Sequence, residues 1–185
     1  VDALRPPHGL VGVWGDQGTG KSFFFKAVVL ANLARGRPTF VLDYGTRFSP
    51  RPGLVVIRDL DAEQAISRAF REAPSVVAMD EADTDFGSDD PPPKKSARNE
   101  LVRYARNPQL DPTRNFYRRG AVSFLYVARR LMDVLPRLRS STNVVFTGRL
   151  SGASDLEELR RLTSHEFAKR VSALEDRSFL RFDRT

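Results

Sequence analysis

The chain has 185 residues, and 41% of them are hydrophobic, which is enough to form one buried core without disulfides or structural metals. It contains no cysteine, which excludes a disulfide framework and a thiolate metal site. No secretory signal and no long apolar span are visible. We therefore expect a single cytoplasmic domain over residues 1–185, with no membrane segment.

The chain carries a formal net charge of +7, and only five of its 30 basic residues are lysine. Eleven arginines fall between Arg98 and Arg149, against three acidic residues. Such a concentrated basic region would attract a polyanion and release its counterions, as nucleic-acid binders do. The alternative is an arginine-rich composition spread over a solvated surface.

The first expected strand, Leu10 to Trp14, leads directly into a phosphate-binding motif. This motif satisfies every defined position of the P-loop pattern, and its residues are Gly15, Asp16, Gln17, Gly18, Thr19, Gly20, Lys21 and Ser22. Its glycines allow backbone N–H groups and the N-terminus of the next helix to converge on phosphate oxygens. Lys21 would reach the β- and γ-phosphates, and the Ser22 hydroxyl would ligate Mg²⁺. We expect these residues to bind ATP together with Mg²⁺.

The helix expected after the P-loop, Ser22 to Arg35, begins with three consecutive aromatic residues, Phe23, Phe24 and Phe25. Three such rings could form a stacking platform. Their position directly after the P-loop favours instead the packing of this helix against a sheet.

Five further apolar runs are expected to be strands, because they are enriched in β-branched and aromatic residues and are separated by polar, Pro or Gly residues. These runs are 39–43, 54–58, 76–80, 122–128 and 144–149. Helices are expected at 61–72, 97–106, 133–138, 155–162 and 165–174, before a strand-like tail at 179–182. Continuous apolarity is typical of strands that are buried on both faces. The pattern predicts a doubly wound α/β fold, with a mostly parallel central sheet and helices on both faces.

The expected strand 76–80 ends in two adjacent carboxylates, Asp80 and Glu81, which is the pattern of a Walker B element. At the carboxyl end of a strand beside the P-loop, Asp80 would hold Mg²⁺ through its water shell, and Glu81 would polarise the attacking water. Glu81 favours hydrolysis, because many P-loop kinases that act on small acceptors lack a carboxylate there. Asp83 and Asp85 follow closely and could assist, but their interpretation as solvated loop carboxylates is favoured.

The segment Asp85–Lys95 contains three consecutive prolines, which cannot continue a helix or a strand. We expect a mobile loop at 85–95. Its place after Glu81 suits a lid or a DNA-facing loop, and an ordinary surface insertion is the alternative.

Several features around the expected strand 122–128 occur in a distinctive order. Arg118-Arg119-Gly120 precedes the strand, Arg129-Arg130 follows it, and the stretch 138–143 leads to the next strand. Together with the P-loop and Walker B element, this order resembles the FtsK/HerA superfamily of DNA-pumping ATPases. The resemblance implies a P-loop NTPase with a RecA/FtsK-like core that works as a homo-oligomer, usually a ring.

The resemblance also implies roles for individual arginines. The family usually has a glutamine that senses the γ-phosphate at the strand end where this chain has Arg129; a guanidinium can also contact phosphate. The family's arginine finger, which acts on a neighbouring subunit's nucleotide, points here to Arg118 or Arg119. Arg114 and Arg149 are less favoured candidates. Each of these arginines could equally lie on the surface or contact the DNA backbone.

Small members of the superfamily resemble the genome-packaging ATPases of tailless viruses and also the ATPases of filamentous-phage assembly. The latter usually carry a membrane segment, so the packaging ATPases are the better match. The resemblance therefore implies a motor on double-stranded DNA, with little sequence readout and a capsid or portal partner, in the host cytoplasm or associated with the virion. The alternatives are a filamentous-phage-type assembly ATPase, a nucleotide-dependent assembly switch and a small-molecule P-loop kinase.

Overall fold

The computed structural model describes residues 9–43, 48–58, 62–106 and 122–184. Within these ranges, the strands are β1 (Leu10–Trp14), β2 (Thr39–Leu42), β3 (Leu54–Ile57), β4 (Ser75–Met79), β5 (Val122–Ala128), β6 (Val144–Thr147) and β7 (Leu180–Asp183). The helices are α1 (Lys21–Leu33), α2 (Ala62–Arg71), α3 (Ala97–Arg106), α5 (Pro136–Ser141), α6 (Ala153–Leu162) and α7 (His165–Ser172). A short 3₁₀ turn, η2 (Ala82–Thr84), follows β4.

The strands form one sheet in the order β3-β2-β4-β5-β1-β6-β7. All neighbouring pairs are parallel except β6 and β7, which are antiparallel. The predicted α/β class, with a mostly parallel central sheet, is confirmed. The expectation that the Walker B strand lies beside the P-loop strand is corrected, because β5 separates β4 from β1.

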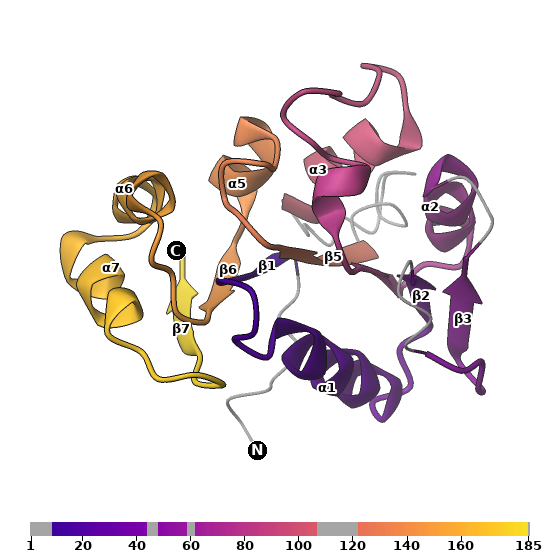
Figure 1. Ribbon diagram of the computed structural model, residues 1–185. Helices are drawn as coiled ribbons and strands as arrows, with labels where there is room; N and C mark the ends of the chain where they lie inside the picture. Colours follow the sequence, from indigo (N-terminus) through magenta and orange to yellow (C-terminus); the bar gives the residue numbers. More distant parts are fainter. Residues whose placement is uncertain (1–8, 44–47, 59–61, 107–121, 185) are drawn as a thin grey trace.

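The two faces of the sheet are covered unequally. Figure 1 shows α1 on one side of the sheet and α2, α3 and α5 on the other. Side chains alternate along β1. Leu10 and Trp14 point to the face covered by α2, α3 and α5, whereas Val11 and Val13 point to the face covered by α1. Every residue of β1, β4 and β5 is buried, which explains why these runs are continuously apolar.

Helix α5 begins three residues later than the sequence predicted. Pro136 occupies its first turn, where the missing N–H costs no hydrogen bond, whereas Asp133–Leu135 precedes the helix. Val134 forms an isolated bridge with Gly87, and Ser88 N–H donates to the Asp133 carbonyl at 2.9 Å. These contacts hold Asp133 and Val134 outside the helix.

The proline-containing segment 85–95 has no helix, as the sequence predicted, and only the single bridge at Gly87. Its first part is fixed, because Phe86 is fully buried against Phe124 of β5. The mobility of the remainder stays a prediction.

The C-terminal part of the chain extends the sheet past β6. Ser164 caps α7 by accepting a hydrogen bond from the Phe167 N–H at 3.1 Å. The loop after α7 then leads into β7, which Figure 1 shows at the edge of the sheet. In the described parts of the chain, every helix is too short or too polar to cross a membrane.

Candidate nucleotide-binding site

The P-loop connects the carboxyl end of β1 to the first turn of α1. Gly18 and Gly20 have φ angles of 84° and 88°, a left-handed conformation that residues with a side chain rarely adopt. Gly20 is the N-cap of α1, and it has no side chain that could cap the first N–H groups of the helix. These backbone donors are thus positioned to bind an anion.

Lys21 is held inside the P-loop. Its ammonium donates a hydrogen bond to the Asp16 carbonyl at 2.7 Å, and the Thr19 hydroxyl donates to the same oxygen at 2.8 Å. Burial lowers the pKa of the Lys21 ammonium below its ordinary value, a shift opposed by Asp16 and reinforced by Arg129. A phosphate group would restore the charge interactions that burial removes from this ammonium.

Asp16 joins the P-loop to the segment after β6. Its N–H donates to the Arg149 carbonyl at 2.8 Å, and its carboxylate accepts from the Ser151 hydroxyl at 2.7 Å. Asp16 therefore fixes the shape of the loop through its backbone and its side chain together.

The two Walker B carboxylates lie at the end of β4. Asp80 is only 3% exposed, whereas Glu81 is half-buried. Glu81 has φ 65° and ψ 55°, a left-handed conformation that is uncommon for a residue with a side chain. Such strain persists only where the surrounding structure imposes it, and it is concentrated at functional sites.

A cavity of about 350 Å³ brings these elements together. It is lined by P-loop and early α1 residues, by the Walker B carboxylates and by the end of β5: Gln17, Gly18, Gly20, Lys21, Ser22, Phe23, Asp80, Glu81, Val127 and Arg129. The ends of parallel strands meet at one edge of a sheet, so β1, β5 and β4 contribute to one site despite their separation in sequence. The predicted P-loop, Walker B and sensor positions are therefore neighbours in space.

Asp80 and Ser22 are suitable ligands for Mg²⁺, because this ion prefers oxygen donors and needs only one or two from the protein when water and phosphate supply the rest. The buried carboxylate of Asp80 and the hydroxyl residue Ser22 line the same cavity. The residues present thus fit the ion.

Arg129 follows β5 and lies at the boundary between two hollows. Its side chain is 57% exposed, and its guanidinium lies 4.0 Å from the Asp83 carboxylate. It lines the nucleotide cavity and also a second cavity of about 380 Å³, which includes Asp83 and Asp133. Arg129 is therefore weakly held at the edge of the cavity that the P-loop lines.

The interpretation of Asp83 and Asp85 as solvated carboxylates was wrong. The Asp83 side chain is 22% exposed, and one of its oxygens is buried without a hydrogen bond from the described residues. Asp85 is 13% exposed and lies 3.6 Å from the Arg98 guanidinium. The turn η2 directs both side chains back toward the protein, a direction that a loop composition does not predict.

The expectation that Phe23, Phe24 and Phe25 pack on the sheet holds for only two of them. Phe25 is fully buried, and Phe24 stacks on Phe179 with ring centroids 4.6 Å apart. Phe23 is 83% exposed and lines the cavity. The helical period places it on the outer side of α1, so a three-residue run cannot be buried as a unit.

The arginine-rich region is divided by the fold. Arg98 pairs with Glu63 at 2.7 Å, Arg139 with Glu158 at 3.2 Å, and Arg149 with Asp176 at 3.0 Å. Several arginines of the basic region are thus paired with carboxylates of the same chain. The finger candidates Arg118 and Arg119, and also Arg114, lie outside the described residues.

The sheet order, the P-loop and the Walker B carboxylates define a P-loop ATPase. The chain belongs to the ATPase family associated with various cellular activities (AAA), whose family model matches residues 11–148. It is an ATP-hydrolysing enzyme, as the sequence predicted. No curated protein sequence matches the chain at a significant level.

Solved structures extend the comparison to nearly the whole chain. The genome packaging NTPase B204 of Sulfolobus turreted icosahedral virus 2, bound to AMPPCP, has a TM-score of 0.76 and 18% identity over 97% of this chain and 93% of that one. The DNA-packaging ATPase B204 of Sulfolobus turreted icosahedral virus has a TM-score of 0.72 and 19% identity over 96% and 93%. The pCW3 conjugation coupling protein TcpA has a TM-score of 0.58 and 17% identity over 96% of this chain and 58% of that one. The predicted resemblance to viral packaging ATPases is confirmed for the fold.

Proposed function

We propose that this ATPase is the motor subunit of a homo-oligomeric ring that moves double-stranded DNA, with a viral capsid or portal as its docking partner. The observation that carries the proposal is the cavity in which Lys21, Glu81 and Arg129 meet. The fold around it is shared, along nearly the whole chain, with a genome packaging NTPase and a DNA-packaging ATPase. A motor needs such a site because a side chain, here Arg129, must change position when the γ-phosphate is lost.

Within this cavity, the P-loop N–H groups and Lys21 hold the phosphates. Glu81 accepts a proton from water as the water oxygen forms a bond to the γ-phosphorus, and the bond from that phosphorus to the β–γ bridging oxygen breaks. The products are ADP and inorganic phosphate. Mg²⁺, held by Ser22 and Asp80, would neutralise charge on the β- and γ-phosphates.

Arg129 is suited to report this change. In the structure, its guanidinium lies 4.0 Å from the Asp83 carboxylate. A γ-phosphate in the cavity would offer a stronger, charge-assisted hydrogen bond. Hydrolysis would remove the phosphate that holds Arg129. The side chain would then move, and the segment that follows β5 would move with it.

The arginine finger would come from a neighbouring subunit, at Arg118 or Arg119. Subunits with Arg118→Ala or Arg119→Ala, mixed with Lys21→Ala subunits, should recover part of the ATPase rate at interfaces that pair an intact P-loop with an intact finger. Absence of recovery for both, in oligomers shown to be mixed, would remove these two residues from the finger role.

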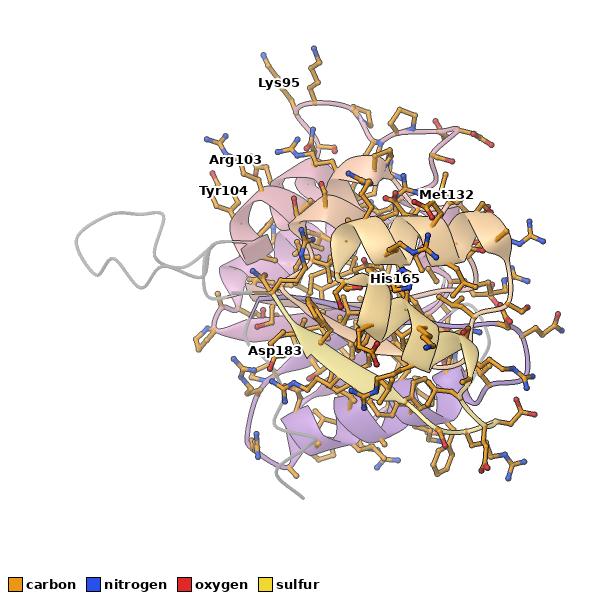
Figure 2. The ribbon with its side chains drawn as sticks, turned by 90° about the vertical axis from the view of Figure 1, so that its left-hand side faces the viewer. Lys95, Arg103, Tyr104, Met132, His165 and Asp183 are labelled. Atoms are coloured by element: carbon orange, nitrogen blue, oxygen red, sulfur yellow. The ribbon has the colours of Figure 1, made fainter. Side chains whose placement is uncertain are left out.

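The surface at α3 is the best candidate for contacting DNA. Lys94, Lys95, Arg103 and Arg137 are all exposed there, and we call these four residues the α3 basic surface. Figure 2 shows Lys95 and Arg103 projecting outward on this side of the molecule. Arg137 donates to Asn99 at 2.8 Å, which joins α5 to α3. Basic side chains of this kind bind phosphates and carry no sequence information.

The test is the ATPase rate with and without long double-stranded DNA, measured together with oligomeric mass. We expect DNA to raise the rate, and affinity to fall steeply with salt, by a slope of about −0.9 for each phosphate contact. Lys94→Ala with Lys95→Ala should reduce that slope by roughly two units and weaken all sequences alike.

The matched control removes two charges elsewhere: Lys169→Ala with Arg170→Ala, both exposed on α7, should leave the slope unchanged. A rate that is indifferent to DNA, together with affinity that does not vary with salt, would contradict the motor and favour an assembly switch.

A further inference from the structure

The loop between α7 and β7, residues 174–179, lies against the P-loop. A Cβ atom at Gly20 would be 3.5 Å from Cγ of Arg177. Arg177 is exposed, and among the described residues its guanidinium makes no hydrogen bond or ion pair. A long cation therefore lies beside a phosphate-binding loop, although it contributes nothing visible to the packing there.

The backbone of Arg177 is held in an unfavourable conformation. Its φ angle is 63°, in the left-handed region that normally requires glycine. The residues on either side of it are anchored: Asp176 pairs with Arg149 at 3.0 Å, and Phe179 stacks on Phe24. Strain that is maintained by flanking anchors indicates a residue selected for its position rather than for its stability.

Phe23 lies in the first turn of α1, three residues after Gly20. Its ring is 83% exposed and lines the nucleotide cavity. Arg177 lies beside Gly20, and Phe179 of the same loop stacks on Phe24, the residue that follows Phe23. Phe23 and Arg177 are therefore both placed at the junction of the P-loop and α1.

The strand order indicates on which side of β1 the γ-phosphate and the base of a bound nucleotide would lie. Glu81 and Arg129 follow β4 and β5, on one side of β1 in the sheet. The loop carrying Arg177 leads into β7, beyond β6 on the other side of β1. A triphosphate whose γ-phosphate meets Glu81 therefore directs its ribose and base away from β4 and β5, toward Phe23 and Arg177.

We propose that Phe23 and Arg177 form the nucleoside subsite, which encloses the base of the bound triphosphate between an aromatic ring and a guanidinium. This inference rests on the nucleotide binding of the proposed function and adds the part of the ligand that the P-loop does not contact. Both groups stack on the face of any nucleobase. The subsite is therefore tolerant of the base, and it favours purines over pyrimidines through their larger face.

The test separates the base from the phosphates by comparing ATP with inorganic tripolyphosphate in calorimetric titrations, in a Glu81→Gln background that prevents turnover. Phe23→Ala and Arg177→Gly should each weaken ATP binding roughly tenfold or more, the size of one lost stacking contact. Tripolyphosphate binding should be unchanged, because it has no base. Arg177→Lys should weaken ATP similarly, since it keeps the charge and loses the planar group.

Arg177→Gly provides a second readout that a purely structural residue would not give. Glycine adopts φ 63° without strain, so the melting temperature should rise while ATP affinity falls. The matched controls are Arg160→Ala, an exposed arginine on α6, and Met132→Ala, the other exposed large hydrophobic residue of the described chain. Neither should change ATP affinity.

Unchanged ATP affinity in the Phe23 and Arg177 variants would overturn the subsite. Equal weakening of ATP and tripolyphosphate would also overturn it, because Arg177 would then contact phosphate. Lys21→Ala should abolish binding of both ligands. If the parent chain bound neither ligand, nucleotide binding at the P-loop would itself fail, and this result is distinct from a loss that is confined to ATP.

Discussion

Two arginines ten positions apart, Arg129 after β5 and Arg139 in α5, show how differently the fold uses one residue type. The Arg129 side chain is 57% exposed, and its guanidinium lies 4.0 Å from the Asp83 carboxylate. The Arg139 side chain is 6% exposed, lies 3.2 Å from Glu158 and donates to the Leu131 carbonyl at 2.9 Å. The guanidinium of Arg129, after β5, remains accessible to a ligand. The guanidinium of Arg139 instead pairs with Glu158 and so links α5 to α6.

This contrast changes the meaning of the basic region. A count of arginines predicts a polyanion-binding surface, but burial decides whether a charge can reach a polyanion. Arg139 and its partner are desolvated, so their attraction mainly offsets the cost of burial. Among the described members of the region, exposed arginines such as Arg103 and Arg137 are those that a polyanion could reach.

The largest expected effects are on triphosphate binding and on turnover at the nucleotide site. Lys21→Ala should abolish triphosphate binding, whereas Glu81→Gln should keep binding and lose about 10²–10⁴-fold in turnover, because one residue holds phosphates and the other acts on water. Titration with ATP and a steady-state phosphate assay measure the two effects. Turnover at the parent rate in Glu81→Gln would show that another group is the base.

Replacing the buried Arg139 should reduce stability rather than turnover. Arg139→Ala removes the buried partner of Glu158, which keeps its hydrogen bonds from Arg161, and leaves the Leu131 carbonyl without its donor. The substitution should lower the free energy of unfolding by about 1.5–3 kcal/mol. Urea denaturation followed by circular dichroism measures this loss. Arg137→Ala, a substitution at an exposed arginine of the same helix, is the matched control and should cost no more than about 0.5 kcal/mol.

Arg129→Ala should complete the contrast with Arg139→Ala. Because Arg129 is exposed and weakly paired, its loss should change the free energy of unfolding by no more than about 0.5 kcal/mol. Turnover should fall about 10²–10³-fold, as when one preorganised donor to transition-state charge is removed. Loss of stability with unchanged turnover would assign Arg129 to structure instead.

The smallest expected effect is a change in the free energy of unfolding at low pH, through Glu158. A hydrogen bond from Arg161 lowers the pKa of Glu158 below its ordinary value, burial opposes the shift, and Arg139 adds to the lowering. A carboxyl whose pKa is lower in the folded state stabilises the fold above its unfolded pKa, about 4.3, and this contribution is lost as pH falls through the folded value. The stability difference between parent and Glu158→Gln should therefore shrink below about pH 4. Urea unfolding at pH 7 and pH 3 tests this, and a constant difference would contradict it.

Much of the fold was predictable because the strands are short and apolar on both faces, and the P-loop marks the junction of β1 and α1. The least accurate helix boundary was that of α5, where the sequence pattern favoured Asp133 and the structure begins at Pro136. The reason is a tertiary contact, since the bridge between Val134 and Gly87 competes with a local helical turn.

Two motifs could be recognised without a structure, because the spacing of neighbouring residues carries the information: the P-loop from Gly15 to Ser22 and the carboxylates Asp80 and Glu81. These motifs are local, so a contiguous stretch is sufficient to define them. Tertiary structure alone decided which side chains meet them from elsewhere in the chain. The insertion of β5 between β1 and β4 brings Arg129 to the cavity that the P-loop lines, and the return of the chain through α7 to β7 brings Arg177 to Gly20. Strand order and burial depend on contacts between distant segments, and no local pattern encodes them.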